Sequence, residues 1–298
     1  MYGAIDLGAT NLRAAVGESD INTVIRLETP RTRLDIENAI EDVLVEACDV
    51  EGANPSQLLA VGIGSIGPLK REAGIVLDPP NLPVAKIELS APISRVADCE
   101  PVIQNDAIAG LRAELSKGAP DNSVYLTMST GIGAGASVDG SIVQGASGNA
   151  AEVGHFIVEP DGRSCGCGGE GHWEAYCGGA NIPSLARDLA STVPATGLDL
   201  DSNLTARDIF SVQDPLSRRV REEIIKYSAR GLANIAHAYD PTVMMIGGSV
   251  ATNNADRFIP SLRERVPNLL AIQPPKMRLT TLDDPVLVGA FVAARESN

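Results

Sequence analysis

Residues 2–17 read YGAIDLGATNLRAAVG, two runs of small and apolar residues separated by a short turn. The first run leads into the turn at 8–11, and apolar residues then alternate with others from Leu12 to Val16. Such alternation is typical of β-strands, and glycine and asparagine are common in tight hairpin turns. The stretch therefore predicts a strand, a glycine-containing turn and a second strand.

The same plan recurs at 123–143, where SVYLTMSTGIGAGASVDGSIV again predicts a strand, a glycine-rich turn and a strand. A repeat on this scale indicates two related halves. Hydrophobic spacing predicts further elements between and after the two stretches. These are helices at about 36–49, 181–191, 217–239 and 286–296, buried strands within 58–69 and 241–250, and a strand followed by a helix within 101–115.

Two such halves predict an α/β fold of two domains with an inter-domain cleft, where ligands lie at the strand ends that carry the glycine turns. A chain of 298 residues is long enough for two domains. We expect a small domain formed by residues 1–108 and 286–298, and a larger domain, with the cysteine-rich loop, formed by residues 109–285.

The chain is acidic, with a net charge of −14, and its basic residues are 19 arginines but only five lysines. A strongly acidic surface repels nucleic acid and anionic membranes, so we expect neither as a partner. It also suits a salt-rich (halophilic) environment, in which concentrated cations screen the repulsion between like charges. An ordinary acidic cytosolic protein is the alternative interpretation.

Cysteine usage and the amino terminus bear on location. Five cysteines at uneven spacing do not resemble a disulfide framework, which favours a reducing compartment. The segment MYGAIDLG lacks the basic and apolar regions of a signal peptide, and no apolar stretch approaches the ~20 residues needed to cross a bilayer. We therefore expect a cytoplasmic protein.

The two glycine turns, DLGATNLR at 6–13 and STGIGAG at 129–135, are candidate phosphate-binding loops. Such turns can direct backbone N–H groups and the hydroxyls of Thr10, Ser129 and Thr130 toward one point. Neither is a Walker A loop, because no Gly-Lys-Ser/Thr follows. The alternative is a pair of ordinary β-hairpins.

Three further positions lie where strands are expected to end. Asp6 could hold Mg²⁺ through water, or could be a turn-forming aspartate. Asn105 and Asp106 stand at a strand-to-helix corner, where a carboxylate could act as a general base on a hydroxyl or could simply cap the helix. Gly247 and Gly248 follow a buried strand and could let a nucleotide base or ribose approach the backbone, or could only end the strand.

The segment CGCGGEGHWE at 165–174 is a candidate zinc loop. Four thiol and imidazole ligands would close the coordination sphere, so the metal would be structural; free thiols beside an interfacial histidine are the alternative. Cys177 could replace one ligand, and Glu152 and Glu174 bracket the loop as candidate acceptors for a polyhydroxylated ligand. The candidate zinc ligands are His155, Cys165, Cys167 and His172.

Together these motifs resemble those of the ROK sugar kinases, a family within the actin-like ATPase superfamily. The resemblance runs from residue 2 to about residue 292. DLGATNLR resembles the family's first phosphate loop, usually DxGGTxxR, with Ala9 in place of a glycine, and STGIGAG resembles its second. QNDAIAG resembles the segment of the catalytic aspartate, GNAAEVGH resembles GxxGExGH, and CGCGGEGHWE resembles CxCGxxGCxE.

The resemblance implies an actin-like (ribonuclease H-like) fold and a role for each motif, with Asp106 as the catalytic base. It implies zinc ligands at His155, Cys165 and Cys167; His172 stands where the family has a third cysteine, and because zinc also accepts imidazole we expect a Cys₂His₂ site. The sugar contacts are expected to be Ser65, Asn81, Asn105, Asp106, Glu152, His155 and Glu174. ATP and Mg²⁺ are expected at the glycine turns, on Asp6, Gly8, Thr10, Asn11, Thr130, Gly131, Gly247 and Gly248.

The resemblance further implies ATP-dependent phosphorylation of a hexose, with glucose the first expectation and fructose, mannose or an N-acetylated amino sugar as alternatives. A non-catalytic sugar-binding regulator and another ATPase of the superfamily are the remaining alternatives. Regulators of this family carry a DNA-binding segment ahead of the kinase domain, whereas this chain starts at the first phosphate strand. The family also implies a homodimer or homotetramer.

Overall fold

The computed structural model describes residues 1–193, 196–201 and 203–298. The described chain divides into two compact units: Met1–Asp121, Gly135–Ala151 and Thr281–Asn298 form the first, and Asn122–Ala134 and Glu152–Thr280 form the second. Residues 109–121 and 135–151 thus group with the first unit, whereas the sequence placed them in the larger domain. The domain boundaries themselves stay a prediction.

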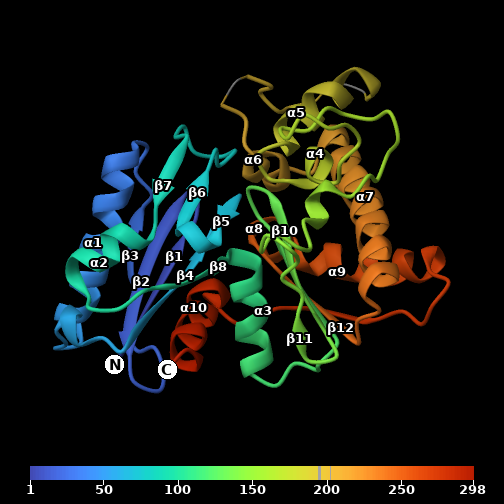
Figure 1. The fold of residues 1–298 in the computed structure, drawn as a ribbon. Helices are drawn as coiled ribbons and strands as arrows, with labels where there is room; N and C mark the ends of the chain where they lie inside the picture. Colours follow the sequence, from blue (N-terminus) through green and yellow to red (C-terminus); the bar gives the residue numbers. More distant parts are fainter. Residues whose placement is uncertain (194–195, 202) are drawn as a thin grey trace. The chain divides into compact units, whose positions relative to one another are not determined.

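The first unit contains a mixed five-stranded sheet of order β3-β2-β1-β4-β8 (Figure 1). The first three strands are antiparallel, because β1 and β2 form the expected hairpin, while β1, β4 and β8 run parallel. The strands are β1 Tyr2–Leu7, β2 Asn11–Gly17, β3 Ile25–Glu28, β4 Ala60–Ser65 and β8 Val102–Asn105.

A second five-stranded sheet has the order β11-β10-β9-β12-β13. In both sheets the first strand along the chain is central, with the second and third strands on one side of it and the fourth and fifth on the other. Strand β12 runs parallel to both β9 and β13. The repeated plan predicted from the two glycine stretches is therefore confirmed; the boundary between the units passes through β10. The strands are β9 Ser123–Met128, β10 Ile132–Val138, β11 Ser141–Ile142, β12 Val243–Gly247 and β13 Lys276–Leu279.

A small antiparallel sheet of the first unit consists of β5 Leu69–Lys70, β6 Ile75–Leu77 and β7 Lys86–Glu88. Asn81 lies in the connection between β6 and β7. Sequence spacing did not predict this sheet, because strands of two or three residues are too short to show a period.

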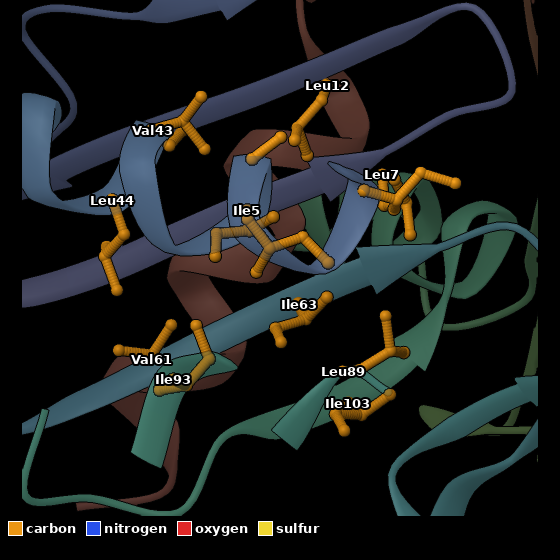
Figure 2. Packing of buried hydrophobic residues seen from close by; sticks show 14 of the residues in the cluster. Ile5, Leu7, Leu12, Val43, Leu44, Val61, Ile63, Leu89, Ile93 and Ile103 are labelled. Carbon is orange, nitrogen blue, oxygen red and sulfur yellow. The ribbon is translucent and has the colours of Figure 1, made fainter. Parts of the chain in front are cut away.

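Helices cover both faces of the first sheet. Side chains of α1 Arg33–Val50 and α2 Ser90–Val96 pack with Ile5 and Leu7 of β1 in one continuous apolar cluster (Figure 2). Because side chains alternate along a strand, Ala4 faces the opposite way and packs against α10 Pro285–Glu296. Helix α3 Asp106–Ser116 packs beside α10.

In the second unit, the long helix α7 Pro215–Tyr239 contacts the end of the cysteine loop. Trp173 is fully buried against Gly231 of α7, where an added Cβ would fall within the indole ring, and its Nε1 donates to Ser228 Oγ at 3.4 Å. The remaining α-helices are α4 Glu174–Cys177, α5 Ile182–Leu189, α6 Ala206–Ser211, α8 Ser249–Thr252 and α9 Ala255–Arg265. Short 3-10 helices lie at Pro55–Gln57, Arg71–Ala73, Val153–His155, Ala190–Thr192 and Val266–Leu269.

The predicted helices at 36–49, 217–239 and 286–296 are confirmed to within three residues at their ends. The helix expected at 181–191 ends earlier, at Leu189, and continues as a 3-10 turn over Ala190–Thr192. Within the described part of the chain, no helix is both long and apolar enough to span a bilayer.

Candidate functional site

Three predicted site segments of the first unit meet at one edge of its sheet. Leu7 at the end of β1 pairs with Ser65 of β4, and Ser65 pairs with Asn105 of β8. The carboxyl ends of parallel strands lie together, and ligands of α/β proteins bind there. The structure therefore brings the turn at 8–11, Ser65 and Asn105 to the same edge.

The first glycine turn is closed by backbone bonds and anchored to the next strand connection. Gly8 N–H donates to Asn11 O at 2.9 Å, and Thr29 donates to the turn twice, from N–H to Thr10 O and from Oγ1 to Gly8 O. Thr10 and Asn11 themselves are exposed. The turn is thus held rigidly from behind while its tip stays accessible.

Asp6 is buried directly beneath this turn, and only 4% of its surface is exposed. Burial raises the pKa of its carboxyl to about 6, although Arg13 opposes that shift by placing Nη1 2.5 Å from Asp6 Oδ2. Asp284 holds Arg13 in turn, through a 3.4 Å contact with Nε, and is itself paired with Arg26. Sequence reasoning missed Arg13, yet its register opposite Asp6 in the predicted hairpin was a usable signal.

Asn105 and Asp106 stand where β8 passes into α3. Asn105 is the N-cap of the helix, and both Asn105 Oδ1 (2.9 Å) and Asp106 Oδ1 (2.7 Å) accept from Ala107 N–H. The capping interpretation is therefore correct for Asn105. The cap formed by Asn105 is compatible with a role for Asp106 as a general base. Asp106 is half-buried at a helix N-terminus, where the macrodipole stabilises a carboxylate.

The other predicted sugar contacts of the first unit differ in accessibility. Ser65 is fully buried and its hydroxyl donates to Ile66 O at 3.1 Å. Asn81 is exposed, and its main-chain oxygen accepts from Arg31. Asn105 has its amide nitrogen near Gly67, 3.6 Å from where a Cβ would stand there.

The second sheet repeats this arrangement at its own carboxyl edge. The turn of Ser129 to Gly131 follows β9, and Gly247 at the end of β12 pairs with Thr127 of β9. Gly248 has a φ of 86°, and a Cβ on it would fall within the main chain of Met128. Packing against the main chain of Met128 thus explains why position 248 is a glycine. This agrees with the interpretation in which Gly247 and Gly248 only end the strand.

The four candidate zinc ligands come together in the second unit. Their ligand atoms all lie within 4.8 Å of one another. Cys165 Sγ is 3.8 Å from His155 Nδ1, and Cys167 Sγ is 3.2 Å from His172 Nδ1. In a tetrahedral zinc site with ordinary bond lengths, neighbouring sulfur and nitrogen ligands are about 3.6 Å apart. The donor set and its spacing therefore fit a zinc ion.

Cys177 does not belong to this cluster. It is fully buried behind the loop, where its Sγ contacts Ile224 O and Ser228 Oγ at 3.5 Å. Burial raises the pKa of its thiol to about 12. The alternative in which Cys177 replaces a zinc ligand is thus wrong.

The two glutamates that bracket the loop have different surroundings. Burial raises the pKa of Glu152, partly offset by His155, and Glu174 raises it further. Glu174 begins α4 and accepts from Ile132 N–H through Oε2 at 2.7 Å. Glu174 is therefore attached to the second glycine turn, a contact that sequence reasoning did not foresee.

A cavity of about 270 Å³ lies in the second unit beside α8, which follows Gly248. Arg221 lines it and donates to Phe210 O and Val212 O, while burial lowers its pKa. Within the described chain its Nη1 is buried without a hydrogen-bond partner. Sequence reasoning missed this cavity, because helices and loops distant in sequence form it. Its lining includes Phe210, Arg221, Ile224, Val250, Thr252 and Asn254.

Two sheets of one strand order, each with a glycine turn at its carboxyl edge, define a two-domain actin-like ATPase fold, as predicted. The chain belongs to the ROK family, whose model matches residues 2–296.

Curated relatives cover nearly the whole chain. The glucokinase of Pyrobaculum calidifontis is 35% identical over 98% of this chain and 94% of its own length, and that of Aeropyrum pernix is 37% identical over 94% and 90%. Among solved structures, a ROK family glucokinase from Streptomyces griseus in complex with glucose and AMPPNP superposes with a TM-score of 0.83 at 27% identity, covering 99% of both chains.

Proposed function

We propose that this protein is an ATP-dependent hexose kinase of the glucokinase type, which transfers the γ-phosphoryl group of ATP to the 6-hydroxyl of glucose. The observation that carries the proposal is the placement of Asp106. It stands at the same carboxyl edge of the first sheet as the phosphate turn, in a chain that is over a third identical to two glucokinases. That edge is where a phosphate donor and a hydroxyl acceptor can be brought to one point.

Asp106 acts as the general base in this mechanism. Its carboxylate is fixed at the first turn of α3 by the Ala107 N–H, so it has a defined direction from which to accept the proton of the attacking hydroxyl. Phosphoryl transfer asks little covalent chemistry of a protein. Asp106 therefore contributes by orienting the hydroxyl and taking its proton, while the remaining site residues hold the reactants in line.

The proposed sugar contacts are Ser65, Asn81, Asn105, Glu152, His155 and Glu174. Amides, imidazole and carboxylates offer both donors and acceptors, which a ring of hydroxyl groups requires. Mannose differs from glucose in configuration at C2, fructose is a ketose, and N-acetylated amino sugars carry an acetamido group in place of a hydroxyl. The hexose panel below separates them.

The phosphates of ATP are held at the two glycine turns. Gly8, Thr10 and Asn11 form the first, and Thr130 and Gly131 form the second. Magnesium takes carboxylate and phosphate oxygens and keeps several waters. Asp6 supplies a carboxylate beneath the first turn, so it is the residue that would hold Mg²⁺ through water.

We assign the cavity beside α8 to the adenosine part of ATP. It lies beside α8, the helix that follows Gly248, and Phe210 and Ile224 in its lining suit a flat base. Arg221 adds a buried donor, Nη1, that lacks a partner within the described chain. Apolar side chains combined with polar groups that fix the orientation of the ligand are typical of sites for such ligands.

Zinc, bound by His155, Cys165, Cys167 and His172, would cross-link the loop and supply folding free energy rather than chemistry at the phosphate. Four protein ligands leave no position for substrate. Zinc binding would also fix the positions of the neighbouring side chains, because Glu152 lies three residues before the ligand His155 and Glu174 two residues after the ligand His172.

A cytoplasmic enzyme that works as a homodimer or homotetramer completes the proposal. None of the five cysteines, all within the described chain, forms a disulfide, which fits a reducing compartment. The net charge of −14 disfavours nucleic acid and anionic membranes as partners.

The test is ADP release from Mg-ATP, measured with glucose, fructose, mannose and N-acetylated amino sugars in turn. We expect turnover with glucose above the others. The variant Asp106→Asn keeps the shape of the side chain but cannot accept the proton, so its turnover should fall by about 10²–10⁴-fold while glucose still binds by calorimetry. The exposed Asp98→Asn substitution in the same unit serves as the matched control.

Near-normal turnover of Asp106→Asn would remove Asp106 from the mechanism. Sugar binding without ADP release from any hexose would instead identify a sugar-binding regulator. ATP turnover that needs no added sugar would point to another ATPase of the superfamily.

A further inference from the structure

We propose that Glu174 is a positioning residue for the nucleotide, because its side chain fixes the second glycine turn that would hold the phosphates. This inference rests on the proposed kinase function and deepens it. It joins the zinc loop to the ATP site, in addition to the sugar contact already assigned to Glu174.

The turn that follows β9 is fastened from one side. Glu174 Oε2 accepts from Ile132 N–H at 2.7 Å. The connection after α4 adds two backbone bonds, from Gly179 N–H to Ser129 O at 2.7 Å and from Ala180 N–H to Thr130 O at 3.0 Å. Glu174 supplies the one bond of the three that a side-chain substitution can remove.

Glycine at position 131 is what allows the carboxylate to reach the turn. A Cβ there would stand 2.5 Å from Glu174 Oε2, closer than such atoms approach. Gly131 is therefore required by the contact with Glu174, whether or not a phosphate also lies against it.

Electrostatics favours a positioning role over a direct one. A carboxylate beside a turn that receives phosphate groups repels those groups, and Glu174 Oε2 already accepts from Ile132 N–H. Its benefit is mechanical: a charge-assisted bond holds the turn in one conformation and keeps its N–H groups aimed before the ligand arrives.

Glu174 is itself rigidly held. Its main-chain oxygen accepts from Gly178 N–H at 2.9 Å and from Asn181 Nδ2 at 3.1 Å. The residue before it, Trp173, is fully buried, and His172 belongs to the zinc cluster. His172 is thus a candidate metal ligand, Trp173 is a buried core residue, and Glu174 is the residue whose side chain bonds to the turn.

Two substitutions separate the reach of the side chain from its charge. Glu174→Asp keeps the charge but is one methylene too short to bond to Ile132 N–H from the same backbone position. Glu174→Gln loses the charge but keeps an acceptor oxygen at the same reach. Binding of Mg-ADP, measured by calorimetry without any sugar, reports on the turn alone.

We expect Glu174→Asp to weaken Mg-ADP binding about tenfold and Glu174→Gln to stay within about threefold of the unsubstituted protein. Hydrogen exchange of the peptide that contains Ile132, followed without ligand, should be faster in Glu174→Asp and unchanged in Glu174→Gln. Glu152→Gln is the matched control: it alters the other bracketing carboxylate, which has no hydrogen bond to the turn within the described chain, so it should change glucose affinity and leave Mg-ADP affinity intact.

Equal Mg-ADP affinity and equal exchange in all variants would overturn the inference, as would a loss in Glu174→Gln that spares Glu174→Asp. Failure of the unsubstituted protein to bind Mg-ADP would overturn the proposed kinase function instead. Zinc content and circular dichroism establish that each variant is folded before its binding is compared.

Discussion

Asp6 shows how a single site residue is tuned by its surroundings. It lies on β1 between apolar neighbours, and the sheet buries it, which raises its pKa to about 6 from an ordinary 3.8. Arg13 is paired across the hairpin and limits that shift without abolishing it. Strongly shifted carboxyl pKa values are more common at functional sites than in ordinary turns.

This pKa predicts how Asp6 makes stability depend on pH. Between about pH 4 and pH 6 the folded chain retains a proton on Asp6 that the unfolded chain has released, so the Asp6 contribution to the free energy of unfolding falls as pH rises. The fall amounts to roughly 3 kcal/mol. Urea unfolding in EDTA should therefore show that the unsubstituted protein loses this much relative to Asp6→Asn across the window. Parallel pH profiles for the two proteins would contradict the assignment.

The residue types of the candidate site could be read from sequence more completely than their contacts. The zinc cluster was predictable because soft ligands within a glycine-rich loop have few other uses. The bond from Glu174 to Ile132 was not, because it joins positions that only the fold brings together. Cys177 was ambiguous for the same reason: its sequence spacing fits a ligand, and only its burial against Ser228 excludes it.

At the scale of elements, strands and long helices can be predicted from the periodicity of hydrophobic residues. The conformation of short elements is instead decided by their contacts with the rest of the fold. Helix α1 begins at Arg33 rather than near Ile36 because Thr32 caps it, accepting from Asp35 N–H at 3.3 Å. That cap was a readable signal. Helix α8 and strand β5 were not readable, since two to four residues carry no period and tertiary contacts decide their conformation.

The cysteine loop gives a prediction for metal removal. Zinc should be present at one ion per chain, and it should remain so in Cys177→Ser but be lost in Cys167→Ser. A maleimide at neutral pH should label Cys165 and Cys167 only after a chelator has removed the metal. Cys177 should stay unlabelled in the folded protein, because burial raises its pKa to about 12.

Peptide mapping by mass spectrometry locates the label. Labelling of Cys165 and Cys167 that is equal with and without chelator would show that they do not bind a metal. Cys48 provides an internal control in the other compact unit, because it is buried and its pKa is raised to about 11.

At the scale of the whole molecule, the duplication was readable from two glycine stretches, and the sheets confirm it with one strand order. The extent of each compact unit was not readable, because α3 and the segment 135–151 group with the first unit through contacts of high sequence separation. Helix α3 packs so closely on both neighbours that a Cβ on Gly289 of α10 would stand 1.7 Å from Ala109 O, and a Cβ on Gly135 would stand 2.6 Å from Ala107 O.

The net charge of −14 predicts how the protein responds to salt. Its exposed ion pairs, such as Arg95 with Glu41, contribute little and weaken in salt, whereas repulsion among the excess carboxylates acts over the whole surface. The screening length falls from ~10 Å at 0.1 M to ~3 Å at 1 M salt. We therefore expect the midpoint of thermal unfolding to rise by about 2–4 °C over that range, equivalent to about 1 kcal/mol. Equal rises in KCl, NaCl and choline chloride would identify screening as the cause, a rise in one salt alone would identify specific cation binding, and a fall in all three would show that ion pairs outweigh the repulsion.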